Sequence, residues 1–249
     1  MSQMIATHQP KYSESPHKFM AREIIPWLYR LASGNKKIPH NKQYLTLANI
    51  QDNSPTSEYN QMVNYSKLID PSQFVGIDNN KIYIRKNKKT HPEATFLCGD
   101  WNVVLSKKQF DPAVVYLDST HFGDKLPALR TLKNTLNICG DDTLVVCNVM
   151  ETNPRSGLGE LLDTKILLEN LLHKEIPAKY KDWNKDKNHK SWQETENSHI
   201  YIPGYTYQTA KTRMKSYIFY KGFIPSENQI QNLFTEFTAW CDSFEKNFC

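Results

Sequence analysis

The chain has 249 residues, of which 39% are hydrophobic and 23% charged, and its formal net charge is +5. This composition is ordinary for a soluble globular protein and too apolar for a wholly disordered one. The mild basic excess permits a polyanionic partner without requiring one. No stretch approaches the roughly 20 apolar residues of a membrane span, and the polar first residues lack the apolar core of a secretory signal. We therefore expect a cytoplasmic protein, or one in the cytosol of a host cell, without a membrane partner.

A helix and then a regular alternation of short elements are predicted along the first two thirds of the chain. Residues 1–15 are polar and typical of a loose tail. Apolar residues then recur at helical spacing over residues 17–32, which predicts an amphipathic helix. Five short apolar runs follow, typical of parallel strands buried on both faces, at residues 44–48, 73–77, 94–98, 113–117 and 143–149. Helical stretches are predicted at residues 57–65, 79–88, 126–138 and 158–173, and this alternation indicates a doubly wound sheet.

The C-terminal part of the chain carries a different signal. A polar segment at residues 177–198 reads as an insertion, and two β-like runs follow at residues 200–208 and 213–222. The four residues between these runs are too few for a crossover helix, so the runs must form an antiparallel hairpin. A last amphipathic helix is expected at residues 226–244.

Together these elements predict a three-layer α/β sandwich. Its sheet is expected to be mostly parallel and seven-stranded, with a C-terminal antiparallel hairpin and flanking N- and C-terminal helices. The domain organisation expected is a tail and helix, a central domain with the polar insertion, and a C-terminal helix, at residues 1–42, 43–222 and 223–249.

Acidic residues stand at the ends of three consecutive runs, where an open α/β sheet binds its ligand. The second run is followed by Asp78, the third by Gly99, Asp100 and Trp101, and the fourth by Asp118. The order of the elements, the terminal hairpin and these residues resemble the class I S-adenosylmethionine-dependent methyltransferases over residues 43–222.

The resemblance implies S-adenosylmethionine as cofactor and gives each strand end a role. Asp78 would hold the cofactor ribose, although an Asp there also suits the N-cap of the next helix. Asp100 would reach the adenine amine, and Trp101 would pack on the ring. Alternatively, Trp101 is simply the first core residue of a short helix.

The fourth strand end departs from the family pattern. Amino-group methyltransferases carry Asp-Pro-Pro-aromatic or Asn-Pro-Pro-aromatic there, whereas this chain has Asp118-Ser119-Thr120-His121-Phe122. Asp118 and His121 are the catalytic candidates, as an orienting carboxylate and a general base. A lone His at a strand end is more often a structural hydrogen-bonding group. Ser119, Thr120 and Phe122 are substrate-contact candidates.

The first strand end departs further, because no glycine follows it. The family's Gly-x-Gly turn lets the backbone approach the cofactor, and here Ala48 and Asn49 occupy the corresponding place. The long loop after them either binds the cofactor through side chains or has lost it. After the fifth strand, Asn148 and Arg155 are substrate candidates or parts of an ordinary connection.

No metal site or disulfide framework is expected from the cysteines. They are odd in number, widely spaced and without a C-x-x-C pair, at Cys98, Cys139, Cys147, Cys241 and Cys249.

Two functions of different class follow from these patterns. The first is a methyltransferase whose acceptor the sequence leaves open, with a nucleic-acid base or a protein amine as candidates. The second is a catalytically inactive methyltransferase-like scaffold that binds nucleic acid or a protein partner. The basic segment at residues 179–192, which contains Trp183, favours nucleic acid, because aromatic rings stack on bases while lysines contact phosphates. The absence of G-x-G-x-x-G argues against a nicotinamide-dependent reductase.

Overall fold

A computed structural model describes residues 16–34, 36–119, 125–150, 193–194, 200–202, 206–209, 212–221 and 226–248. Its strands are β1 (Gln43–Leu47), β2 (Phe74–Asp78), β3 (Thr95–Cys98), β4 (Pro112–Ser119), β5 (Thr143–Met150), β6 (Gln193–Glu194), β7 (Ile200–Ile202), β8 (Thr206–Thr209) and β9 (Thr212–Lys221). Its helices are α1 (Pro16–Ser33), α2 (Glu58–Asn60), which continues into a π-helical turn (Gln61–Tyr65), α3 (Lys81–Thr90), α4 (Trp101–Lys107), α5 (Lys125–Ile138) and α8 (Glu227–Phe248), with a 3-10 turn at Pro71–Gln73.

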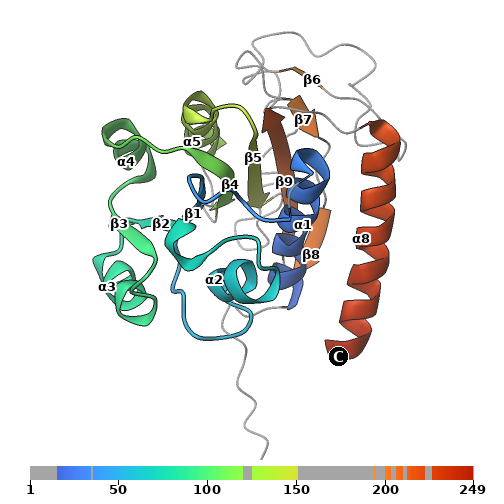
Figure 1. Cartoon of the computed structure of the whole chain (residues 1–249), viewed down its shortest axis with the longest axis horizontal. Coiled ribbons are helices and arrows are strands. Elements are labelled where there is room, and N and C mark those ends of the chain that lie inside the picture. Colours follow the sequence, from blue (N-terminus) through green and yellow to red (C-terminus); the bar gives the residue numbers. More distant parts are fainter. Residues whose placement is uncertain are drawn as a thin grey trace, which may run out of the picture.

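The sheet has the doubly wound order predicted from the alternation. Its strands run in the order β3-β2-β1-β4-β5-β9-β7-β6, and β8 also pairs with β9 (Figure 1). Strands β1 to β5 are mutually parallel, whereas β9 pairs with β5 in the antiparallel sense over the whole length of β5. The antiparallel hairpin is confirmed, because β8 and β9 pair up to Thr209 and Thr212.

The predicted number of seven strands is wrong. In the part of the chain that is described, six strands form the central sheet, β3-β2-β1-β4-β5-β9, and the shorter β6, β7 and β8 add to its far side. The single run expected at residues 200–208 is two strands, β7 and β8. Both pair with β9, but their pairing registers differ by one residue, so they do not form one continuous ladder.

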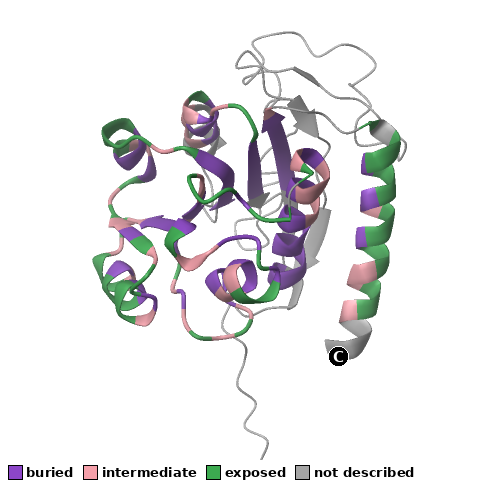
Figure 2. Ribbon diagram, in the orientation of Figure 1, coloured by how far each residue is buried: buried purple, intermediate pink, exposed green. Residues whose placement is uncertain are grey.

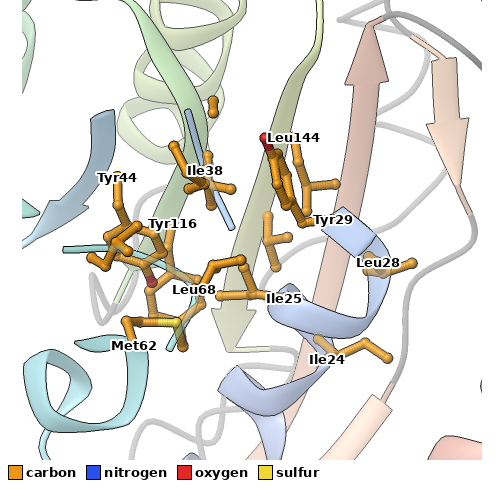
Figure 3. Close-up of a cluster of buried hydrophobic side chains, with 14 of the residues drawn as sticks. Ile24, Ile25, Leu28, Tyr29, Ile38, Tyr44, Met62, Leu68, Tyr116 and Leu144 are labelled. Carbon is orange, nitrogen blue, oxygen red and sulfur yellow. The ribbon is translucent and has the colours of Figure 1, made fainter. Parts of the chain in front are cut away.

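Helices cover both faces of the sheet and separate two apolar cores. One core joins the sheet to α1, α2, α3 and α8, and the other joins it to α4 and α5. Figure 2 shows the central strands and the sheet-facing side of α1 as buried. Figure 3 shows Ile25 of α1 beside Leu68 in the first core, to which Ile24 and Leu28 of the same helix also belong. Full burial of one such aliphatic side chain stabilises the fold by about 2 kcal/mol, so α1 is held by its apolar face.

Gly76 lets β1, β2 and β3 approach one another closely below the ends of their strands. A Cβ atom at this position would lie 2.6 Å from the Ala48 Cβ and 2.9 Å from Phe96 Cδ1. Both contacts are shorter than real Cβ contacts, so a larger residue at position 76 would push the strand ends apart. The small residues at positions 48 and 76 therefore set the spacing of these strands.

Within the described ranges, no helix combines the length and the apolar character that crossing a membrane requires. The predicted helix at residues 158–173 lies outside the described residues, as does nearly all of the polar segment at residues 177–198.

Candidate functional site

The carboxyl ends of β1 to β4 surround a cavity of about 310 Å³. Asp78, Asp100 and Asp118 all line it, and they come from the ends of β2, β3 and β4. Residues that are distant in the sequence meet here because parallel strands end at the same edge of the sheet. The structure thus brings the three predicted carboxylates to one crevice.

Asp78 closes β2 and holds the turn that leads into α3. Its Oδ1 accepts a hydrogen bond of 2.6 Å from the Asn80 backbone N–H. The Asn80 side chain, not that of Asp78, is the N-cap of α3, since its Oδ1 accepts from the backbone N–H groups of Ile82 and Tyr83. Burial raises the pKa of Asp78 above its ordinary value, and the Asn80 N–H opposes this shift. Tyr83, one turn into α3, also lines the cavity.

Asp100 and Trp101 begin α4. Asp100 is the N-cap, and its Oδ1 accepts a 3.2 Å hydrogen bond from the Val103 N–H. Trp101 is buried, and its Nε1 donates a 2.9 Å hydrogen bond to Thr135 Oγ1 of α5. Trp101 is therefore the first core residue of a short helix, which is one of the two roles expected from the sequence. It also lines the cavity beside Asp100.

Asp118 is almost completely buried and is paired with a lysine from the first helix. Lys18 Nζ donates a hydrogen bond of 2.5 Å to Asp118 Oδ2, and both side chains are at most 5% exposed. The other oxygen, Oδ1, is buried and has no hydrogen-bond partner among the described residues. The site thus contains a carboxylate with one oxygen engaged and one oxygen that has no partner in the described part of the chain.

The glycine-free turn after β1 is built by side-chain amides. Ala48 is buried and is not among the cavity-lining residues; its N–H donates to the Ile77 carbonyl at 2.9 Å. Asn49 is exposed and lines the cavity. The fully buried Asn87 of α3 holds the loop, because its amide donates to the Asn49 carbonyl at 2.9 Å and accepts from the Gln51 N–H at 2.8 Å. Ala48 to Ser57 have no positive φ, so this turn does not need glycine.

The remaining substrate candidates lie elsewhere or outside the described residues. Ser119 pairs with Val149 at the end of β4, and only its backbone is described. Asn148 is fully buried within the sheet: it donates to the Tyr116 hydroxyl at 2.7 Å and accepts from Ser216 at 2.5 Å. It does not line the cavity. Thr120, His121, Phe122 and Arg155 lie outside the described residues.

A buried group of charges beside Asp118 escaped the sequence analysis. Arg22, one turn after Lys18, donates to the Thr56 carbonyl at 2.7 Å. Glu58 accepts a 2.9 Å hydrogen bond from the Tyr44 hydroxyl. Burial raises the pKa of Glu58 to about 7, although the positive charge of Arg22 favours ionisation. The available signal was a pair of cations spaced by four residues on the otherwise apolar face of the predicted first helix.

At the level of sequence, no family model and no curated protein matches the chain. Solved structures do match. Magnesium protoporphyrin IX methyltransferase from Synechocystis PCC 6803, solved with bound SAH, has a TM-score of 0.52 and 7% identity, covering 82% of this chain and 83% of its own. N-methyltransferase NodS from Bradyrhizobium japonicum WM9 has a TM-score of 0.48 and 10% identity, covering 82% of this chain and 97% of its own. A TehB-like SAM-dependent methyltransferase from Corynebacterium glutamicum ATCC 13032 Kitasato has a TM-score of 0.40 and 17% identity, covering 79% of this chain and 88% of its own.

The first of these similarities, together with the strand order, defines the class of fold. The chain has the Rossmann-like fold of class I S-adenosylmethionine-dependent methyltransferases, as its strand-end pattern predicted.

Proposed function

We propose that the chain is an S-adenosylmethionine-dependent methyltransferase whose cofactor site is the cavity at the ends of β1 to β4. One observation carries this proposal: Asp78, Asp100 and Asp118, from three consecutive strand ends, line a single cavity. Its volume of about 310 Å³ lies at the lower end of the roughly 300–1,000 Å³ typical of ligand sites. The methyltransferase-like fold supports the same reading.

The chemistry of the lining residues fits this cofactor. A ribose diol presents two O–H donors, and a carboxylate such as that of Asp78 accepts both. The adenine amine is a further donor, for which Asp100 offers the acceptor capacity that its single hydrogen bond to Val103 leaves over. Asn49 supplies an amide at the end of β1, where the glycine turn is missing.

When bound, the cofactor supplies an electrophilic methyl group on a sulfonium. The protein must then place a nucleophile in line with that methyl group, in a site from which water is excluded. Asp118 is suited to orient an N–H donor, since it is buried and one of its oxygens has no described partner. A nitrogen acceptor, in a nucleic-acid base or an amine, fits a carboxylate at this place.

Isothermal titration of the purified chain with S-adenosylmethionine tests the proposal. We expect heat of binding and a stoichiometry of one per chain. Absence of both heat and thermal stabilisation at a high cofactor concentration would remove the proposed activity and leave the inactive scaffold as the better reading.

One observation favours nucleic acid as the acceptor or partner. Helix α3 presents five exposed basic side chains next to the cavity-lining Asn80 and Tyr83, at Lys81, Arg85, Lys86, Lys88 and Lys89. Lysine and arginine in this arrangement suit a phosphate backbone. The basic segment at residues 179–192 lies outside the described residues. Gel shifts with DNA and RNA at two salt concentrations test this proposal: binding must weaken as salt rises, and no shift at low salt would reject it.

A further inference from the structure

The ion pair of Lys18 and Asp118 joins the first helix to the candidate site. Around Lys18, α1 turns apolar side chains toward the sheet, such as Ile24 and Ile25, yet Lys18 itself is only 3% exposed. A buried ion pair is a poor way to stabilise a fold, because desolvation of the two charges offsets their attraction. A packing role alone would be met equally well by two apolar residues. The buried amine therefore points to a role in the site.

The position of the Lys18 amine matters because its partner, Asp118, lines the candidate cofactor cavity. Asp118 stands at the end of β4, on the cavity that Asp78 and Asp100 also line. The proposed function gives Asp118 the task of orienting the nitrogen acceptor. In the structure, the nitrogen that lies against this carboxylate is Nζ of Lys18, at 2.5 Å.

We propose that Lys18 is itself a methyl acceptor, so that the chain methylates its own first helix. This inference rests on the proposed function, since S-adenosylmethionine supplies the methyl group. The Lys18 ammonium gives one proton to Asp118 Oδ2. The neutral amine then attacks the methyl carbon: an N–C bond forms, the S–C bond breaks, and its electron pair stays on sulfur. The proton on Asp118 passes to water, leaving N-methyllysine and S-adenosylhomocysteine.

The reaction requires the Lys18 side chain to move. Asp118, but not Lys18, lines the cavity, so the amine must turn past the carboxylate to meet the cofactor. Lys18 is the third residue of α1. Backbone N–H groups in a first helical turn have no intrahelical partner, and helix ends open more easily than helix centres. A lysine side chain is long and flexible, and its attachment to the same chain gives the amine a high effective concentration.

Peptide mass spectrometry after incubation with S-adenosylmethionine tests the inference. We expect a mass increase of one CH2 group on the peptide that contains Lys18, dependent on added cofactor. Lys18→Arg keeps the positive charge beside Asp118, so we expect it to fold and to show no such increase. Lys42→Arg, at an exposed ion pair with Asp111, leaves the Lys18 methylation unchanged. An unmodified Lys18 in a wild-type chain that binds cofactor, or methylation confined to other lysines, overturns the inference and leaves the proposed function intact.

A binding measurement gives a second readout that does not depend on turnover. Lys18→Met leaves Asp118 without its counter-ion. If Lys18 lies close to the reacting sulfonium, the positive charge of the sulfonium then faces this unneutralised carboxylate. The preference for S-adenosylmethionine over the neutral S-adenosylhomocysteine should then rise by roughly tenfold in titration calorimetry, whereas Lys42→Met leaves it unchanged. An unaltered preference in a folded Lys18→Met variant overturns the inference. Failure of the wild-type chain to bind either compound is a different result, which removes the proposed function as well.

Discussion

Replacing Lys18 by methionine should destabilise the protein strongly, because it leaves a carboxylate buried without its counter-ion. Methionine has nearly the length of lysine, so the packing of α1 is kept while Asp118 loses the ammonium at 2.5 Å. Both side chains are at most 5% exposed, so water cannot take over the lost interaction. Breaking a buried pair by removing one partner costs about 3–5 kcal/mol. In a domain of this size, each kcal/mol lowers the Tm by roughly 2–4 °C, so we expect a decrease of roughly 6–20 °C.

Thermal and urea unfolding, followed by circular dichroism, measure this effect. The matched control is Lys42→Met, which removes an ion pair of similar length, 2.6 Å, whose side chains are 22% and 55% exposed. An exposed pair contributes about 0–1 kcal/mol, so this variant should unfold close to the wild type. The double variant Lys18→Met with Asp118→Leu should recover most of the loss, because no unpaired charge remains. The reasoning is refuted if Lys18→Met costs no more than Lys42→Met.

Three further changes test the site and its surroundings. Asp78→Asn should weaken binding of S-adenosylmethionine by about tenfold or more, since a hydrogen bond to a charged group contributes about 1.5–3 kcal/mol; calorimetry measures it. Gly76→Ala should destabilise the fold by about 1–3 kcal/mol in urea unfolding, because the new Cβ would lie 2.6 Å from a neighbouring side-chain carbon. Burial raises the pKa of Glu58 from 4.5 to about 7, so its stabilising contribution is complete below pH 4.5 and is lost as the pH rises through 7. The wild type should lose up to about 3 kcal/mol over that window, and Glu58→Gln should lose less.

The first two changes have control variants, and the third is judged against the wild type. Asp111→Asn alters an acidic residue just before β4, at the opposite edge of the sheet from the cavity, and should leave cofactor affinity unchanged; equal losses in both variants would show that Asp78 is not specific. Gly140→Ala adds a methyl group with no heavy atom within 4 Å and should be nearly neutral, so similar costs at Gly76 and Gly140 would contradict the packing argument. Parallel stability profiles of wild type and Glu58→Gln between pH 4.5 and 7 would show that Glu58 is not the titrating group.

Most of the sheet could be predicted because its strands are buried on both faces. Such strands are apolar along most of their length, so β1, β2, β4 and β5 appear in the sequence as short, mostly apolar runs. The hairpin of β8 and β9 could be predicted from the short connection between the two runs. The split of one expected strand into β7 and β8 could not, because it depends on a register difference of one residue against β9. Pairing register is decided by the partner strand and leaves no mark in local composition.

The candidate site was predictable only in part, for a related reason. Asp78, Asp100 and Asp118 were found because a strand end is a local signal and the sheet edge collects such ends. Lys18 was missed, because it stands exactly 100 positions before its partner and no periodicity links the two. Asn87 was missed as well: it replaces the glycine turn through hydrogen bonds to Asn49 and Gln51, which only the docking of α3 makes possible.

The sequence by itself determined the class of fold, the direction of the last long strand and the edge of the sheet at which acidic residues gather. These properties depend on apolar periodicity and connection length, which are local. The tertiary structure alone decided the surroundings of the site: the lysine on Asp118, an Oδ1 without a partner among the described residues, the buried Glu58 and the amide-built turn. Electrostatic energies depend on distance and burial in space, and neither can be read along a chain before it is folded.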